Sequence, residues 1–177
     1  MVGTPEFSRI VGVGSLPRGG RTIAIEADAA EREALAKRFD LVAIDALQAR
    51  FALRAGRGDT VLVDGTLSAA VVQRCVVTLD PLPATIEEEV EAVFADAAAD
   101  HDSAEIEVDP LAAEVEPLVD GRVDLGELAA QHLLLALDPY PRSPDAPPPV
   151  VEAPPVEIET RRPFAGLKPG GDGDGEG

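Results

Sequence analysis

Several residue types are scarce in this 177-residue chain, and each scarcity excludes a class of protein. A single Cys excludes an intrachain disulfide framework and any zinc site built on cysteines. There is no Trp and aromatic residues make up only 3%, so the core must consist mostly of Val, Leu, Ile and Ala. No apolar run approaches the ~20 residues of a membrane-spanning helix, and we expect no signal peptide. We therefore expect a soluble cytoplasmic protein with no membrane partner.

Basic residues are also few, with 15 Lys and Arg against 33 Asp and Glu, which gives a net charge of −18. This balance argues against a surface that coats nucleic acid, because phosphate binding needs clustered cations. The excess is concentrated in residues 85–127, which carry fifteen acids and only one base. That block is either a solvated acidic surface or a docking face for a basic partner. Residues 1–84 hold ten acids and ten bases, so a local basic face remains possible there.

Hydrophobic periodicity and capping signals predict most of the elements. Strands are expected at residues 7–16 and 21–27, then a helix capped by Asp28 that runs to about Phe39. Residues 41–79 read as an antiparallel meander, in which 60–79 is one bent strand or two, with Gly65 at a bulge or kink. Residues 85–95 fit a helix by pattern alone. A last helix should follow the cap Asp124 and end near residue 137, before Pro139.

Composition changes after Arg142 and predicts the domain organisation. Residues 1–142 should form a single α+β domain, and 143–160 a Pro-rich linker. Residues 161–168 place Phe164 and Leu167 inside a local positive charge, which is typical of a short docking segment. Residues 169–177 contain mainly Gly and acids and are expected to be disordered.

No catalytic residue, metal site or cofactor site is visible in the sequence. There is no phosphate-binding loop, and nothing selects an acid and base pair from 33 carboxylates. Cys75 lies on an expected strand and is interpreted as a buried structural thiol. We therefore expect a protein that is not an enzyme, and a metal-dependent hydrolase stands only as a remote alternative.

Four stretches in order resemble the bacterial YceD family, also called the large ribosomal RNA subunit accumulation protein. They are residues 71–81, 120–127, 133–141 and 162–168, and their motif residues are Gln73, Arg74, Cys75, Arg162, Pro163, Phe164, Leu167 and Lys168. The chain departs from the family where Val71 or Val72 replaces the first Cys of a paired-cysteine form, so a metal role at Cys75 is not supported. An acidic Gly tail also replaces the basic C-terminal end.

The resemblance implies a role in the synthesis, processing or stability of 23S rRNA, without enzymatic activity. The family's gene commonly neighbours that of a small basic ribosomal protein of the large subunit. The resemblance also implies that residues 85–95 continue the meander as a strand, and we prefer that prediction. The expected fold is α+β, with a mainly antiparallel, curved or barrel-like sheet and two or three packed helices. The expected core contains Leu35, Phe39, Leu47, Phe51, Leu53, Val61, Val63, Cys75, Leu128 and Leu133.

Two functional hypotheses follow. The first is a cytoplasmic ribosome-biogenesis factor that binds a basic ribosomal protein or a large-subunit assembly intermediate through Glu87, Glu89, Glu91, Asp120, Asp124 and Glu127. The alternative is direct rRNA binding through Arg50, Arg54, Arg57 and Arg74, of which the first two share one strand face.

Overall fold

The computed structural model describes residues 5–14, 16–56, 60–96 and 115–148. The chain divides into two compact units, Met1–Ala146 and Pro147–Gly177, and nearly all of the second lies outside the described residues. The expected linker beyond residue 148, the docking segment at 161–168 and the tail lie outside them too. The elements of the first unit are β1 (Ile10–Gly12), β2 (Arg21–Glu26), α1 (Ala29–Arg38), β3 (Ala43–Ala55), β4 (Thr60–Arg74), β5 (Pro81–Asp96), β6 (Val115–Leu118), β7 (Arg122–Asp124) and α2 (Leu125–Ala136).

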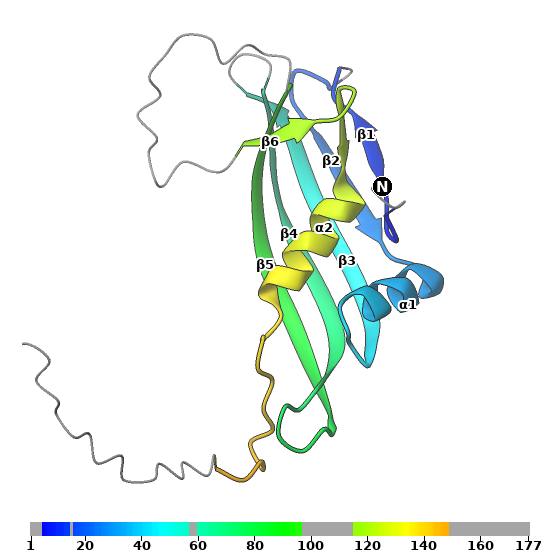
Figure 1. The fold of residues 1–177 in the computed structure, drawn as a ribbon. Coiled ribbons are helices and arrows are strands. Elements are labelled where there is room, and N and C mark those ends of the chain that lie inside the picture. Colours follow the sequence, from blue (N-terminus) through cyan, green and yellow to red (C-terminus); the bar gives the residue numbers. More distant parts are fainter. Residues whose placement is uncertain (1–4, 15, 57–59, 97–114, 149–177) are drawn as a thin grey trace, which may run out of the picture. The chain divides into compact units, whose positions relative to one another are not determined.

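The strands form two sheets (Figure 1). The larger has the order β2-β3-β4-β5-β6, with antiparallel neighbours from β2 to β5 and a short parallel pairing between β5 and β6. The smaller pairs β1 with β7 in antiparallel fashion. Within the described residues the large sheet is open, with β2 and β6 at its two edges, so it is a curved sheet rather than the barrel-like alternative.

The period-two pattern of the central strands produces one buried face, as expected. On β3 the side chains of Leu47, Ala49, Phe51 and Leu53 are buried, and alternate residues of β4 and β5 lie opposite them. We call this helix-covered face the inner face, and the other the outer face. The pairing of β3 with β4 is continuous past Gly65, and its irregularity lies between Ile44 and Ala46 instead. The expected bulge at Gly65 is therefore wrong.

Gly65 is required for a different reason: the backbone and a side chain of β3 come too close to it to leave room for a Cβ. A Cβ at this position would lie 2.3 Å from the carbonyl oxygen of Arg50 and 2.5 Å from the ring of Phe51. Glycine thus makes room on the inner face for the largest side chain of β3.

Both helices pack on the inner face, α1 against β3 and α2 against β4 and β5 (Figure 1). Helix α1 begins with the expected capping box, because Asp28 accepts from the N–H of Glu31 and Glu31 accepts from the N–H of Asp28. Asp124 caps α2 as expected, accepting from the N–H groups of Gly126 and Glu127. This start of α2 is not a full capping box, because the Glu127 side chain binds Arg38 instead of the N–H of Asp124.

The core confirms nine of the ten expected residues as buried, and Phe39 packs against it half-buried. Phe7 was not among the expected core residues, yet it is completely buried although it precedes the first strand. Residues 85–95 belong to β5, so the prediction from the family resemblance is confirmed and the helix predicted from pattern alone is wrong.

Candidate functional site

Two of the four family-like stretches come together at one end of the sheet. The turn after β4 carries Cys75, and the segment after α2 crosses it. The side-chain nitrogen of Gln73 donates to the Asp138 carbonyl at 2.8 Å, and the N–H of Val76 donates to the Pro141 carbonyl at 2.9 Å. The N–H of Ser143 donates to the Cys75 sulfur at 3.3 Å. Gln73 and Cys75 therefore fasten the chain that leaves α2 to the end of the sheet.

The Cys75 thiol is fully enclosed and unpaired, which confirms the expected buried thiol. Its sulfur accepts from the N–H of Ser143 and, at 3.5 Å, from the N–H of Thr78. These donors favour the thiolate, so they lower the pKa of Cys75 to about 6, with Ser143 contributing most and burial opposing the shift. The sulfur is an acceptor in a structural junction.

An apolar groove of about 430 Å³ surrounds this junction. Its lining includes Phe39, Leu79, Leu134, Leu137 and Pro139. Leu79 and Leu134 are exposed, at 64% and 47%. Leu79 also has a φ of 65°, a left-handed conformation that is uncommon for a residue with a side chain.

The expected acidic residues fall into two groups. Glu87, Glu89 and Glu91 alternate along β5 and are all exposed on the outer face, opposite Ser68, Thr66 and Asp64 of β4. None of the three forms an ion pair with a cation in the described part of the chain. We call these three residues the glutamate row. It is a line of negative charge without a paired cation. On β4, Thr66 separates Glu89 from Arg50, and Asp64, which pairs with Arg54, lies beside Glu91.

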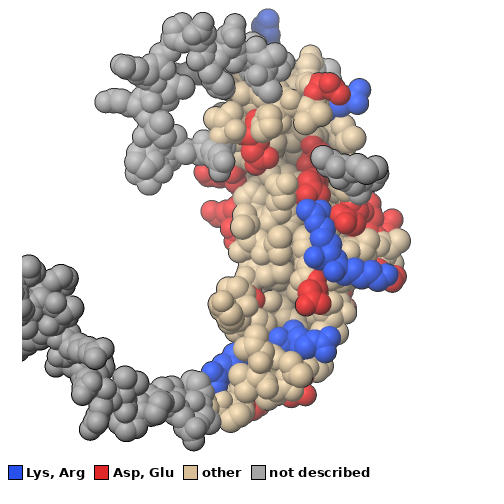
Figure 2. Space-filling model, viewed as in Figure 1, with Lys and Arg blue, Asp and Glu red and all other residues tan. Residues whose placement is uncertain are grey.

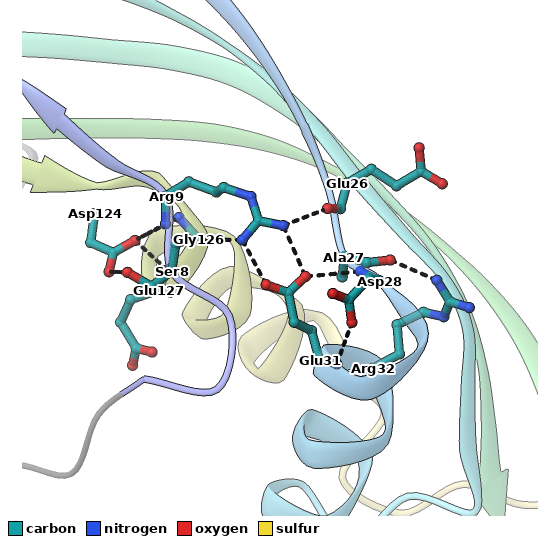
Figure 3. Close-up of polar contacts among 10 residues, drawn as sticks. All are labelled: Ser8, Arg9, Glu26, Ala27, Asp28, Glu31, Arg32, Asp124, Gly126 and Glu127. Atoms are coloured by element: carbon teal, nitrogen blue, oxygen red, sulfur yellow. Dashed lines mark hydrogen bonds and ion pairs between the residues drawn. The ribbon is translucent and has the colours of Figure 1, made fainter.

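The other three acids lie around the start of α2. Asp120 is exposed in the turn before β7, with a φ of 52°. The Asp124 carboxylate accepts from the Ser8 hydroxyl at 2.5 Å and from the Arg9 N–H at 2.7 Å, besides capping α2 (Figure 3). Glu127 accepts from the Arg38 guanidinium at 2.8 Å. Asp124 and Glu127 are therefore used inside the molecule, and the six acids do not form one face.

Arg9 connects the N-terminal segment to α1, a network that sequence reasoning missed (Figure 3). Its guanidinium donates to both carboxylate oxygens of Glu31 at 2.6 and 2.9 Å and to the Glu26 carbonyl at 3.0 Å. It also lies 4.7 Å from the centre of the Phe7 ring. The hydrogen bond from Arg9 is the main cause that lowers the pKa of Glu31.

Arg38 makes the second missed network, bridging Glu6 at 3.0 Å and Glu127 at 2.8 Å. The hydrogen bond to Glu127 is the main cause that raises the pKa of Arg38. On the face that carries α2, Figure 2 shows charges of both signs gathered beside a broad uncharged band. Sequence separations of 22 and 89 residues for the Arg9 and Arg38 pairs explain why no local signal revealed them.

The expected basic residues are dispersed. Arg50 and Arg54 share the outer face of β3, and Arg54 pairs with Asp64. Arg50 contributes to two hollows of that face, of about 370 and 460 Å³, and the second also contains Glu89 and Glu91. Arg74 lies eight residues beyond Thr66, the strand partner of Arg50, and thus about 26 Å along β4. Arg57 lies outside the described residues.

No group of three or more His, Cys, Asp or Glu side chains among the described residues is placed to hold a metal ion. Neither described helix is long and apolar enough to cross a membrane.

The fold and site define an α+β protein with helices on one sheet face and a polar, partly acidic surface on the other. The family model described as large ribosomal RNA subunit accumulation protein YceD matches residues 63–168, more than half of the chain. The chain therefore belongs to the YceD family, whose description concerns the accumulation of large-subunit rRNA rather than an enzymatic reaction. No curated protein and no solved structure gives a significant match.

Proposed function

We propose that this protein supports the synthesis, processing or stability of 23S rRNA by binding a basic ribosomal protein or a large-subunit assembly intermediate. The family supplies the process. The observation that carries the binding mode is the glutamate row, three exposed carboxylates on one face of β5 with no cation paired to them in the described residues.

The row has the geometry of a linear cation-binding surface. Residues two apart on a strand point to the same side, so Glu87 and Glu91 are separated by about 13 Å with Glu89 between them. The Ser68 and Thr66 side chains beside them are uncharged and add no competing cation. Three like charges at this spacing repel one another, and a partner that brings Lys or Arg relieves that repulsion.

Arg50, Arg54 and Arg74 give less support to direct rRNA binding. Arg54 is already paired, Arg50 borders the glutamate row, and Arg74 is remote. RNA phosphates approaching Arg50 would therefore meet the carboxylates of Glu89 and Glu91. For this reason we propose a basic protein as the direct partner, with the rRNA reached indirectly through it.

In this proposal the family-like motif residues have separate roles. Gln73 and Cys75 hold the junction described above, while Arg74 is exposed beside it. Phe164 and Leu167, within the segment that also contains Arg162, Pro163 and Lys168, supply a second, apolar contact to the partner.

The test is a pull-down from lysate with the tagged full-length chain, with and without nuclease. Wild type is compared with the triple variant Glu87→Gln, Glu89→Gln, Glu91→Gln, and with Phe164→Ala. A triple variant Asp45→Asn, Asp80→Asn, Asp145→Asn is the matched control, because it removes three exposed charges elsewhere. We expect a basic ribosomal protein to remain after nuclease, to be lost from the glutamate variant, and to be retained by the control.

Two results would contradict the proposal. If everything recovered disappears with nuclease, binding goes through RNA, and Arg50→Glu becomes the next variant to test. If the complex persists unchanged from low to high salt, an exposed charged contact is not what holds it.

A further inference from the structure

The strand that carries the glutamate row also has an open edge. β4 pairs with β5 along residues 81–95, but on its other side β5 pairs only with β6, through Val93 to Asp96. From residue 81 to 92 that other edge has no strand beside it within the described residues, and none of the backbone hydrogen bonds that join their turns, loops and caps uses it. Figure 1 shows β5 as the outermost long strand, with β6 crossing only near one end.

An open edge presents unpaired hydrogen-bonding groups. Alternate residues of a strand direct their N–H and C=O groups to each side, so about six of these twelve residues face outward. Pro81 and Pro83 have no N–H to donate, which narrows the usable stretch to residues 84–92. This stretch is anchored to the core, because Val90 is completely buried on the inner face and Ile86 packs against the core.

The side chains beside this edge determine which kind of strand can pair with it. A second copy of the chain adding by the same edge would place one glutamate row against another, which like-charge repulsion opposes. A strand with Lys or Arg at alternate positions would instead place its cations beside Glu87, Glu89 and Glu91 on the outer face. Its intervening side chains would lie toward Glu88 on the inner side. β6 already demonstrates that a short strand can pair with this edge.

We propose that the free edge of β5, from residue 84 to 92, binds an extended segment with alternating Lys or Arg by strand addition, extending the sheet by one strand. This inference rests on the proposed function and gives the mode by which its basic partner is held. Main-chain hydrogen bonds supply the pairing, and the period-two match between cations and the glutamate row supplies the preference for basic segments.

The test uses the full chain, labelled with ¹⁵N, and two synthetic peptides. The first is acetyl-Lys-Val-Lys-Thr-Lys-Val-Lys-amide. The second has the same sequence and charge but is N-methylated at two adjacent central residues, which blocks both edges of the strand. We expect the methylated peptide to bind about tenfold more weakly or worse, since the methyl group on the side that faces β5 removes one N–H donor and its bulk disrupts the neighbouring hydrogen bonds. We also expect the first peptide to slow hydrogen exchange at alternate amides of residues 84–92.

The same peptides are tested on the triple Glu→Gln variant of the glutamate row and on the triple Asp→Asn control. We expect the glutamate variant to bind the first peptide about tenfold more weakly or worse at low salt, and the control to bind it as wild type does. Equal binding of both peptides with no exchange protection along β5 would overturn strand addition while leaving an acidic docking surface in place. Absence of binding by either peptide, or equal weakening in both triple variants, would overturn the site and count against the proposed function as well.

Discussion

Replacing Gly126 with Ala should destabilise this protein, although the same change normally stabilises a helix. Gly126 is the second residue of α2, and the gain of Ala over Gly inside a helix, about 0.5–1 kcal/mol, is the most that this position could add. A Cβ at Gly126, however, would lie 2.5 Å from the carbonyl oxygen of Phe7 and 2.8 Å from the Cα of Ser8. These are backbone atoms, so the N-terminal segment must move away from the helix.

The cost follows from what that segment contributes. Phe7 is completely buried, and removing a buried Phe side chain typically costs about 3–5 kcal/mol. Ser8 and Arg9 also supply the hydrogen bonds to Asp124. If the N-terminal segment moves only partly, Phe7 keeps some of its burial. The loss of stability is then nearer to the cost of overpacking a core, about 1–3 kcal/mol. After subtracting the helix gain, we expect Gly126→Ala to lower the free energy of unfolding by about 2 kcal/mol.

Urea unfolding followed by circular dichroism measures this change. Gly14→Ala is the control, because a Cβ at Gly14 meets nothing within 4 Å, and we expect a change below about 0.5 kcal/mol. The double variant with Phe7→Ala should cost clearly less than the two single changes added together, since the segment is already displaced. An unchanged or higher stability of Gly126→Ala would refute the contact between α2 and the N-terminal segment.

Four more outcomes are expected. Because the folded pKa of Cys75 is about 6, below the ~8.5 of a free thiol, the wild-type urea midpoint should rise from pH 6 to about 8.5. Cys75→Ala should lose this rise, and a thiolate absorbance that appears only above pH 8 would contradict the assignment. Gln73→Ala should cost about 1–3 kcal/mol in urea unfolding, because the Asp138 carbonyl loses its side-chain donor. Gly65→Ala should cost a similar amount through its clash with the backbone of β3, and wild-type stability would remove that explanation. Arg9→Met should be less stable than wild type at pH 7, and the difference should shrink as acid protonates Glu31 below its lowered pKa; a gap independent of pH would argue against the ion pair.

Local sequence signals predicted the elements that do not depend on contacts with residues distant in sequence. The alternation in β3 and the acidic caps Asp28 and Asp124 are physical requirements of a half-buried strand and of helix starts, so sequence alone located them. β5 was ambiguous for a definite reason. Its inward residues Ile86, Val90 and Phe94 are spaced by four, which satisfies both a helical stripe and a two-residue alternation. Pairing with β4, a contact beyond local sequence, decides between them.

The candidate site divides in the same way. The period of the glutamate row on β5 follows from its sequence once a strand is assumed, but its isolation from cations does not. That isolation depends on where the bases are held. Arg54, on the same sheet face, pairs with Asp64, and Arg9 and Arg38 bind acids distant in sequence. The same contacts removed Asp124 and Glu127 from the expected acidic face. Sequence therefore supplied the list of acids, and only the packed structure separates those already neutralised from those still free.

Within residues 63–168, which the family model matches, substitutions should therefore have one of two effects: loss of stability or loss of partner binding. Gln73, Cys75, Asp124 and Gly126 are all occupied by internal contacts, so changes there should lower stability and reduce rRNA accumulation only through loss of folded protein. The triple Glu→Gln variant of the glutamate row removes no internal contact and relieves repulsion between neighbouring charges. It should keep or slightly raise the melting temperature while losing the basic partner and 23S rRNA accumulation in complemented cells. If Asp124→Ala lost the partner at full stability, or the glutamate variant unfolded, the assignment of the glutamate row as the binding surface would be wrong.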